Sequence, residues 1–319
     1  MMRSPFRQLH AIGFAGLLLL SGSAIAQSTR ADIRAQLDGA ALGVGYAQLI
    51  GLAATPDIAT ANYTIDSQGS KPTLDVFRLP HQAKWFALTA DSDLYWRIAG
   101  GYLRLKDNLV PPGQGGAVDA KWTAVSGSAG LLARIRLGNG FTLEPSLDMG
   151  LARIENGASY KGAAIARQPL LDGLVFNWHT NAWLVTPSIG LEYATTFGAA
   201  KVTARANVGR SWITSFGESD AAQSFKEAAN AHAIRAEYSR PTGLSVAARP
   251  LDWVVYGGYA GFFGANRDAL GFSSVTEIGT GLELPTSRDR PLSERVRLSA
   301  GLLFGPEVRG WTVGASIRF

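Results

Sequence analysis

The chain contains no cysteine among its 319 residues, which excludes disulfide bridges and thiolate metal sites. Beyond its N-terminal region it also lacks any run approaching about 18 consecutive apolar residues, the length that a membrane-spanning helix requires. Charged residues are scarce, at 17% of the chain against about 25% in average proteins. Hydrophobic residues nevertheless make up 46%. This combination indicates that much of the protein surface faces something other than water.

The N-terminus has the three parts of a secretory signal peptide. Arg3 and Arg7 supply the cations, an apolar stretch centred on Leu17–Leu20 follows, and Ala24-Ile25-Ala26 provides a small-x-small cleavage pattern. We therefore predict a Sec-type signal peptide over residues 1–26, with a retained N-terminal anchor as the alternative. Removing the two arginines lowers the formal net charge from +5 to +3, which is too small to indicate a nucleic-acid partner.

Residues 27–57 form a separate alanine-rich segment. Ile33, Leu37 and Val44 are spaced for one face of a helix. Glycines in the same stretch weaken that pattern, and residues 40–46 could alternate as a strand instead. We predict a short helix or plug segment ahead of the main domain.

From residue 58 to residue 319 the pattern changes to that of strands. The connections between them are alternately long and short, which is typical of the outer loops and periplasmic turns of an outer-membrane barrel. Gly138-Asn139 is the tightest of these turns. An even number of strands would place both mature termini on the periplasmic side. The twelve predicted strands are 58–65, 74–86, 93–106, 118–137, 140–154, 181–197, 200–214, 231–239, 246–263, 274–284, 294–304 and 311–319.

Side chains of opposite character alternate within these runs. Phe141 and Leu143 share one face of a strand, whereas Thr142 and Glu144 share the other. A charged side chain facing lipid at mid-depth would cost about 2–4 kcal/mol, so the polar row is predicted to face the lumen. We interpret its charges as a salt-bridge network that braces the wall, with a charge-selective eyelet or a catalytic carboxylate pair as alternatives. The predicted lumen charges are Arg134, Arg136, Glu144, Asp148, Glu192, Arg205, Arg235, Glu237, Glu277, Glu283, Arg295, Arg297 and Arg318.

Aromatic residues mark the two predicted membrane boundaries, where their amphipathic rings favour the headgroup level. Phe141, Phe197 and Phe319 would lie on the periplasmic side. The outer set is Trp178, Trp183, Trp212, Phe304 and Trp311. The last strand also ends on an aromatic residue, which is similar to the signal that the barrel-assembly machinery recognises. Its lipid-facing row is Trp311, Val313, Ala315, Ile317 and Phe319.

Three segments resemble the β-domains of autotransporters. Residues 140–151, GFTLEPSLDMGL, are similar to the family's strand motif of an aromatic followed by Leu-x-Pro, and VTPSIGLEY at 185–193 is similar again. The aromatic-terminated last strand is the third segment. The resemblance implies a porin-like, twelve-stranded transmembrane barrel in a Gram-negative outer membrane, with a helix entering from the N-terminal side. Because only residues 27–57 stand where an autotransporter has its passenger, the chain resembles the solitary members, and the export role does not carry over.

These observations predict an all-β, antiparallel outer-membrane barrel of structural or small-pore function, without covalent chemistry and not an enzyme. We expect a monomer surrounded by outer-membrane lipid, with no cofactor. The three histidines after the signal peptide, His81, His179 and His232, are too scattered for a metal site. The alternative function is a lipid-acting hydrolase that uses His179 at the outer rim, with Ser211 or Ser215 as its partner.

Overall fold

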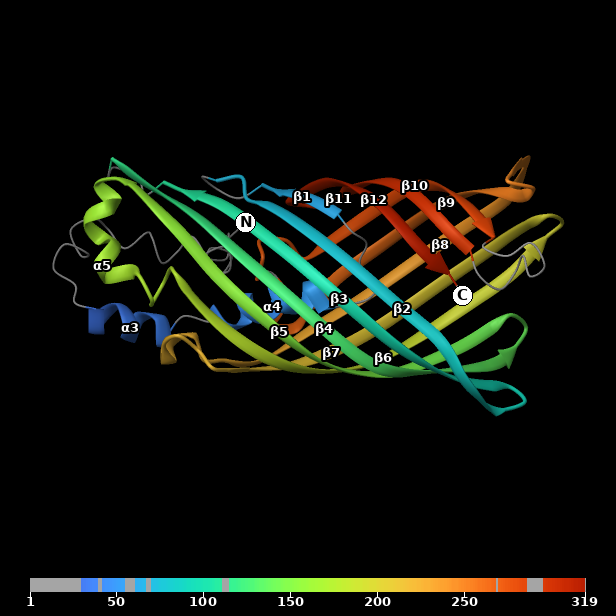
Figure 1. Ribbon diagram of the computed structural model, residues 1–319, viewed down its shortest axis with the longest axis horizontal. Helices are drawn as coiled ribbons and strands as arrows, with labels where there is room; N and C mark the ends of the chain where they lie inside the picture. The colour runs from blue at the N-terminus through green and yellow to red at the C-terminus, as the bar shows by residue number, and fades with distance from the viewer. Residues whose placement is uncertain are drawn as a thin grey trace, which may run out of the picture.

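The computed structural model is a closed barrel of twelve antiparallel strands, with β1 paired to β12 to complete the ring (Figure 1). It describes residues 30–39, 42–54, 61–66, 70–110, 115–267, 269–285 and 295–318. The predicted all-β fold, its strand number and its accompanying helical segment are confirmed. The predicted signal peptide at 1–26 lies outside the described residues.

Two helices precede the barrel, and short helical turns interrupt three of its long connections, β5–β6, β7–β8 and β9–β10. None of the described helices is long and apolar enough to cross a membrane. The elements are α3 (Arg30–Gly39), α4 (Leu42–Ala54), β1 (Ala61–Ile65), β2 (Thr73–Thr89), β3 (Ser92–Leu109), β4 (Gly116–Gly138), β5 (Phe141–Gly162), η3 (Ala163–Arg167), α5 (Gln168–Leu171), β6 (Trp178–Phe197), β7 (Ala200–Phe216), η4 (Ala221–Gln223), β8 (Lys226–Val246), β9 (Arg249–Phe263), η5 (Gly264–Asn266), β10 (Ser274–Pro285), β11 (Arg295–Phe304) and β12 (Val308–Arg318).

The two ends of the barrel differ in their connections. Tight turns join β2–β3, β4–β5, β6–β7 and β8–β9 at one end, the end to which β12 also runs (Figure 1). At the β4–β5 turn Gly138, Asn139 and Gly140 all have positive φ, which a Gly-Asn-Gly sequence adopts with little strain. The opposite end carries η3, α5, η4 and η5. We call these the turn end and the loop end.

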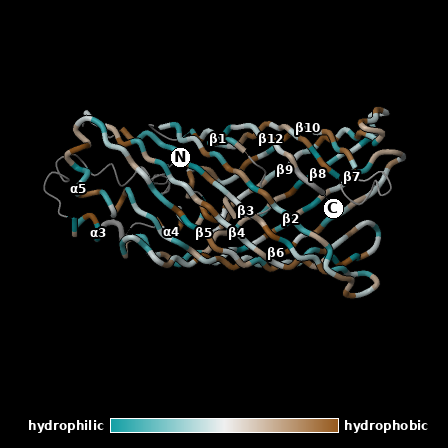
Figure 2. The backbone as a smooth tube through the Cα atoms, viewed as in Figure 1, coloured by the Kyte–Doolittle hydropathy of each residue, from teal (hydrophilic) through white to brown (hydrophobic). Residues whose placement is uncertain are grey.

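The outer face of the wall is apolar over a broad band. Leu147, Met149 and Leu151 are exposed, whereas Glu144 and Asp148 on the alternate positions are buried. Figure 2 shows this as brown and teal segments that alternate along the strands. Exposed apolar rows of this kind belong in lipid.

The loop-end half of the barrel reverses this pattern. There the inward side chains are apolar and buried, among them Leu103, Leu105, Trp122 and Ile154, and they pack around α4. The prediction that inward residues are polar therefore holds only for the turn-end half. Trp178 was predicted to be a boundary residue, and that was wrong: it is 3% exposed and belongs to this interior cluster.

Several strands are longer than predicted. β5 continues to Gly162, whereas 154 was expected, and β8 spans Lys226–Val246, whereas 231–239 was expected. The β8–β9 turn is consequently Ala247-Ala248, both with positive φ, and not residues 240–245. β5 is longer than predicted because its loop-end part lies beyond the lipid band, where the outer face is polar and alternation no longer marks a strand. β8 is extended at both ends, and at the turn end it continues through residues 240–246 although Pro241 and Gly243 are typical of a turn.

Helices α3 and α4 lie in the loop-end half of the molecule, whereas both mature termini were expected at the turn end; residues 27–29 and Phe319 themselves lie outside the described residues. Arg30 of α3 donates hydrogen bonds to the carbonyl oxygens of Pro169 and Asp172, at 3.1 and 2.8 Å. Figure 1 shows α3 beside α5 and α4 inside the barrel. Strand number alone relates the start of β1 to the end of β12. It does not constrain α4, which carries the preceding chain through the lumen to the other end.

Candidate functional site in the lumen

Helix α4 fills the loop-end half of the lumen. Its sequence, LGVGYAQLIGLAA, is apolar on nearly all sides, as expected of a helix surrounded by protein. Leu49 and Ile50 are fully buried. The Tyr46 ring lies 4.7 Å from the Trp178 ring of β6 and 6.0 Å from the ring of Phe225, measured between centroids. The apolar inward residues of the loop-end half, which stand where a polar row was expected, therefore form the surface against which α4 packs.

Small residues let α4 approach the wall closely. A Cβ atom added to Gly43 would lie 2.6 Å from Cβ of Phe225. A Cβ atom added to Gly101 of β3 would lie only 1.9 Å from the carbonyl oxygen of Ala53, in the last turn of α4. The backbone of β3 at Gly101 is thus in direct contact with the backbone of α4 at Ala53, and no side chain can be accommodated between them.

One buried polar contact fixes α4 to the loop-end wall. The Asn266 Nδ2 atom donates to Oε1 of Gln48 at 2.5 Å and to the carbonyl oxygen of Asn230 at 3.1 Å. Gln48 and Asn266 are 2% and 1% exposed. Because an unpaired buried amide costs about 1–3 kcal/mol, this contact specifies the position of the helix as well as stabilising it.

The turn-end half of the lumen holds charged side chains. Arg134 reaches both Glu144 and Glu192 at 2.8 Å, and Glu144 also pairs with Arg205. Glu144 is 2% exposed. The structure thus brings together four of the predicted lumen residues, all on the neighbouring strands β4 to β7.

A second cluster centres on Arg297 of β11. Its guanidinium lies 2.8 Å from Glu237 and 2.6 Å from Glu283, and its side chain is only 5% exposed. Arg295 pairs with Glu283 at 2.8 Å and with Asp252. The carboxylates thus lie between arginines on either side, which offsets the cost of removing these charges from water.

Arg235 connects this cluster to the rest of the wall. It pairs with Glu237 at 2.8 Å and with Glu277 at 3.2 Å, and its guanidinium lies 3.9 Å from the centroid of the Tyr256 ring. Thr312 of β12 donates a hydrogen bond to Glu277 at 2.8 Å. Side chains from β8 through β12 are therefore joined.

Three charged residues that the sequence reasoning missed complete these contacts. Arg97 pairs with Asp148 and donates to Ser146 at 2.8 Å. Asp93 accepts from Arg136 at 2.9 Å, and Asp252 is the partner of Arg295. Asp93 and Arg97 lie on the inward-facing positions of β3. The sequence does not show this, because apolar residues occur on both faces of that strand. The side chain of Arg318 lies outside the described part of the structure, and its backbone pairs with Arg295 in the β11–β12 ladder.

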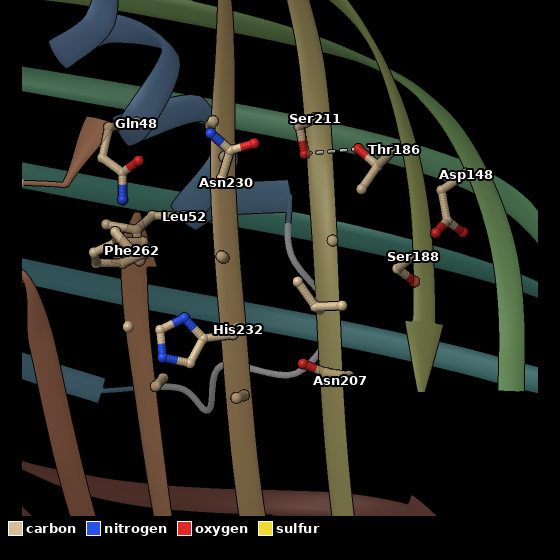
Figure 3. Close-up of a pocket in the computed structure, with 18 of the residues that line it drawn as sticks. Gln48, Leu52, Asp148, Thr186, Ser188, Asn207, Ser211, Asn230, His232 and Phe262 are labelled. Atoms are coloured by element: carbon tan, nitrogen blue, oxygen red, sulfur yellow. Dashed lines mark hydrogen bonds between the residues drawn. The ribbon is translucent and has the colours of Figure 1, made fainter. Parts of the chain in front are cut away.

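A cavity of about 50 Å³ remains between α4 and the charged region. Figure 3 shows Gln48 and Leu52 on the helix side and Asp148, Thr186 and Ser188 on the wall. The Thr186 and Ser211 hydroxyls are 2.8 Å apart. The space suits water molecules, since small-molecule sites usually span about 300–1,000 Å³. No group of three or more acidic or histidine side chains placed to hold a metal ion occurs among the described residues.

His179 does not contact either predicted serine partner. Ser211 bonds with Thr186, and Ser215 donates to Glu218 at 2.6 Å. Instead His179 Nδ1 lies 2.9 Å from the hydroxyl of Ser219, which also accepts from the backbone N–H of His179 at 2.9 Å. Because the hydroxyl is engaged by backbone as well as ring, this contact fastens the β7–β8 connection to β6.

Helix α3 closes the loop end from outside. Arg34 forms an ion pair with Asp220, which caps η4 by accepting from the N–H of Ala222 at 3.0 Å. Partial burial opposes ionisation of Asp220, but the Ala222 N–H and the Arg34 guanidinium together hold its pKa below the usual range. The carboxylate is thus charged at neutral pH and able to retain α3.

Comparison with known proteins identifies the family. A model described as "Solitary outer membrane autotransporter beta-barrel domain" matches residues 53–314. The chain belongs to this family. The resemblance drawn from the strand motifs is thereby confirmed, and so is the outer-membrane location.

Solved structures place the solitary autotransporter barrel in the same fold. The translocator domain of the autotransporter NalP from Neisseria meningitidis is similar with a TM-score of 0.51 and 11% identity, over 81% of this chain and 84% of that one. The transport unit of the autotransporter AIDA-I from Escherichia coli gives 0.50 and 14%, over 92% and 100%. Identities this low show the fold alone. None of the curated proteins matches the chain.

Proposed function

We propose that this protein is a closed structural barrel of the outer membrane and not an open pore. The observation that carries the proposal is the seating of α4, whose buried Gln48 contacts Asn266 of the wall. Membership of a family of β-barrel domains indicates a non-enzymatic protein, and we extend this to the absence of covalent chemistry. In this proposal residues 27–57 act as the plug segment, residues 1–26 as a cleaved signal and residues 58–319 as the barrel.

The lumen charges have a bracing role in this proposal. Each of the carboxylates Glu144, Glu237 and Glu283 contacts two arginines, and these contacts run between strands of the wall. A charge-selective eyelet would instead present uncompensated charge of one sign to the passing solute. Because the carboxylates and arginines of the lumen neutralise one another, they favour a bracing role over a charge-selective eyelet.

Planar-bilayer recordings test the closed state. The full-length protein should give no steady conductance, because α4 fills the loop-end half of the lumen. A variant lacking residues 27–57 should conduct, since the described ion pairs of the lumen join strands that are at most three places apart in the ring. Folding of both proteins is checked by the heat-dependent shift of barrels on gels. Steady conductance of the full-length protein would exclude the proposal.

The last strand is proposed to carry the assembly signal through its outward row. Trp311 and Val313 are 54% and 58% exposed, as a lipid-facing row requires. Deleting Phe319 should reduce insertion by the barrel-assembly machinery severalfold, measured as the heat-resistant fraction in isolated outer membranes. Phe197→Ala, which removes an exposed aromatic at the same end, is the control. Equal insertion of the deletion variant and the wild type would rule out this signal.

The lipid environment follows from the family, whereas the other partners are proposals. We propose a monomer that meets the barrel-assembly machinery during biogenesis and carries its loop-end cap, α3 with α5 and η4, at the cell surface.

A further inference from the structure

Three exposed lysines lie together on the outer wall near the loop end. Lys106 of β3 and Lys121 of β4 occupy directly opposite positions in the antiparallel ladder. Lys71 lies just before β2, where Thr73 is the next neighbour of Lys106. All three line one open groove together with Asn108.

Charge in this groove is unbalanced. Three acidic residues on this part of the outer face each have a closer basic partner, whereas the ion pairs formed between described residues do not include Lys71, Lys106 or Lys121. Lys106 also attracts the Asp75 carboxylate, which is already paired with Arg104. Asp107, which borders the groove, alternates with the buried Leu105 and Leu109 and so belongs to the inward row. The neutralised pairs are Asp75 with Arg104, Asp119 with Lys161, and Glu155 with Arg153.

The arrangement of Lys106 and Lys121 is unfavourable by itself. Directly opposed side chains in an antiparallel pair have Cβ atoms about 4.5–5.5 Å apart, and like charges there destabilise the ladder. An anion bound between the two ammonium groups would convert this repulsion into attraction.

The distance of the lysines from the lipid-facing band, measured along the membrane normal, indicates which kind of anion they could meet. On β3 the outward row runs from the exposed Ile98 and Tyr102 to Lys106. Four residues of strand span about 13 Å, which is about 9 Å along the membrane normal at a tilt of about 45°. On β4, Lys121 stands the same four residues beyond the exposed Val125. With the loop end at the cell surface, as proposed above, the ammonium groups are at the headgroup level of the outer leaflet, and their flexible stems can adjust to it.

We propose that Lys71, Lys106 and Lys121 form a binding site for the phosphate groups of an outer-leaflet lipid. Ammonium groups serve as point charges for phosphate and need no fixed geometry. The proposal rests on the position of the wall in the membrane and is independent of whether the lumen is closed.

Lipid titration of the purified full-length protein tests the site, with diphosphorylated lipid A as the probe and native mass spectrometry as the readout. The Lys106→Gln, Lys121→Gln double variant should bind about 25-fold more weakly, because each basic residue near an anionic surface contributes about fivefold. Lys201→Gln, an exposed lysine beside the β6–β7 turn, should bind like the wild type. Dephosphorylated lipid A should not distinguish the proteins. Equal binding by the double variant, or equal affinity for inorganic phosphate and the lipid, would overturn the proposal.

Thermal stability provides a second measurement, in which the effect of the double substitution should change direction when the lipid is added. In lipid-free micelles the double variant should unfold at the same temperature as the wild type or higher, because it lacks the repulsion between the two lysines. With diphosphorylated lipid A present it should unfold at a lower temperature than the wild type. A double variant that is less stable in both conditions would assign the lysines a purely structural role and refute the proposal.

Discussion

Replacement of Arg297 by methionine should lower the free energy of unfolding by about 3–5 kcal/mol, the usual cost of breaking a buried ion pair from one side. The guanidinium lies between Glu237 and Glu283, and the side chain is 5% exposed. Methionine keeps much of the volume but leaves both carboxylates with less compensation in a poorly hydrated lumen. Urea unfolding in lipid vesicles, followed by tryptophan fluorescence, measures the change.

Two further variants separate the network from charge removal in general. Arg153→Met removes an arginine whose side chain is 46% exposed and whose partner Glu155 is on the outer face, so it should cost no more than about 1 kcal/mol. Adding Glu283→Gln to Arg297→Met should recover part of the loss, because the carboxylate that has lost one of its two arginines becomes neutral while Arg295 keeps Asp252 as its partner. An Arg297 variant as stable as the Arg153 variant would contradict the bracing role.

Replacement of Gly101 by valine should displace the end of α4 and open the lumen to ions. The first side-chain carbon would lie 1.9 Å from the Ala53 carbonyl oxygen and 2.8 Å from its carbon atom, and a backbone group cannot rotate away as a side chain can. Overpacking of this kind costs about 1–3 kcal/mol. Channel events in planar bilayers, absent from the wild type, are the expected signature.

The preceding glycine is a matched control. A Cβ atom on Gly100 would meet nothing within 4 Å, because this residue faces outward. Gly100→Val should therefore leave conductance unchanged and stability within about 0.5 kcal/mol of the wild type. If the two valine variants behave alike, the contact between β3 and α4 does not hold the plug in place.

The sequence was informative wherever one face of a strand meets lipid and the other meets polar groups. Residues 141–151 alternate without a break, so both the strand and the buried position of Glu144 followed from periodicity alone. The Gly-Asn-Gly turn was equally clear, because its positive φ angles require such residues. Strand number and fold class rest on features of this kind.

The same reasoning failed where the environment of the wall changes along a strand. Trp122 and Ile154 face a helix and not a polar lumen. In such strands the inward row is apolar at the loop end, and the outward row changes from apolar in the lipid band to polar beyond it. The sequences of these strands do not indicate which part of the lumen the predicted plug segment will occupy. The Ala247-Ala248 turn was missed for a different reason, since alanine is rarely found at positive φ and gives no turn signal.

The candidate site was predictable in its residue types but not in its partners. Glu144, Glu237 and Arg297 were identified from parity, whereas Arg97 and Asp252 were not. Pairs such as Arg297 with Glu237 join positions 60 residues apart, and that distance depends on barrel curvature and register. Neither the curvature of the barrel nor the register between strands can be derived from the sequence of a single strand.

The shortness of β1 has a kinetic consequence. It has 5 residues and joins positions 61–65 to 308–312, whereas β3 has 18. The two partners come from opposite ends of the barrel sequence, so their meeting carries the largest entropy cost of chain closure for a ladder of only five residue pairs. Ring closure is therefore expected as the final step of folding, after α4 has been enclosed. The two ladders of β1, with five residue pairs to β12 and four to β2, should be the first to open under load, since local opening begins where the fewest bonds must break.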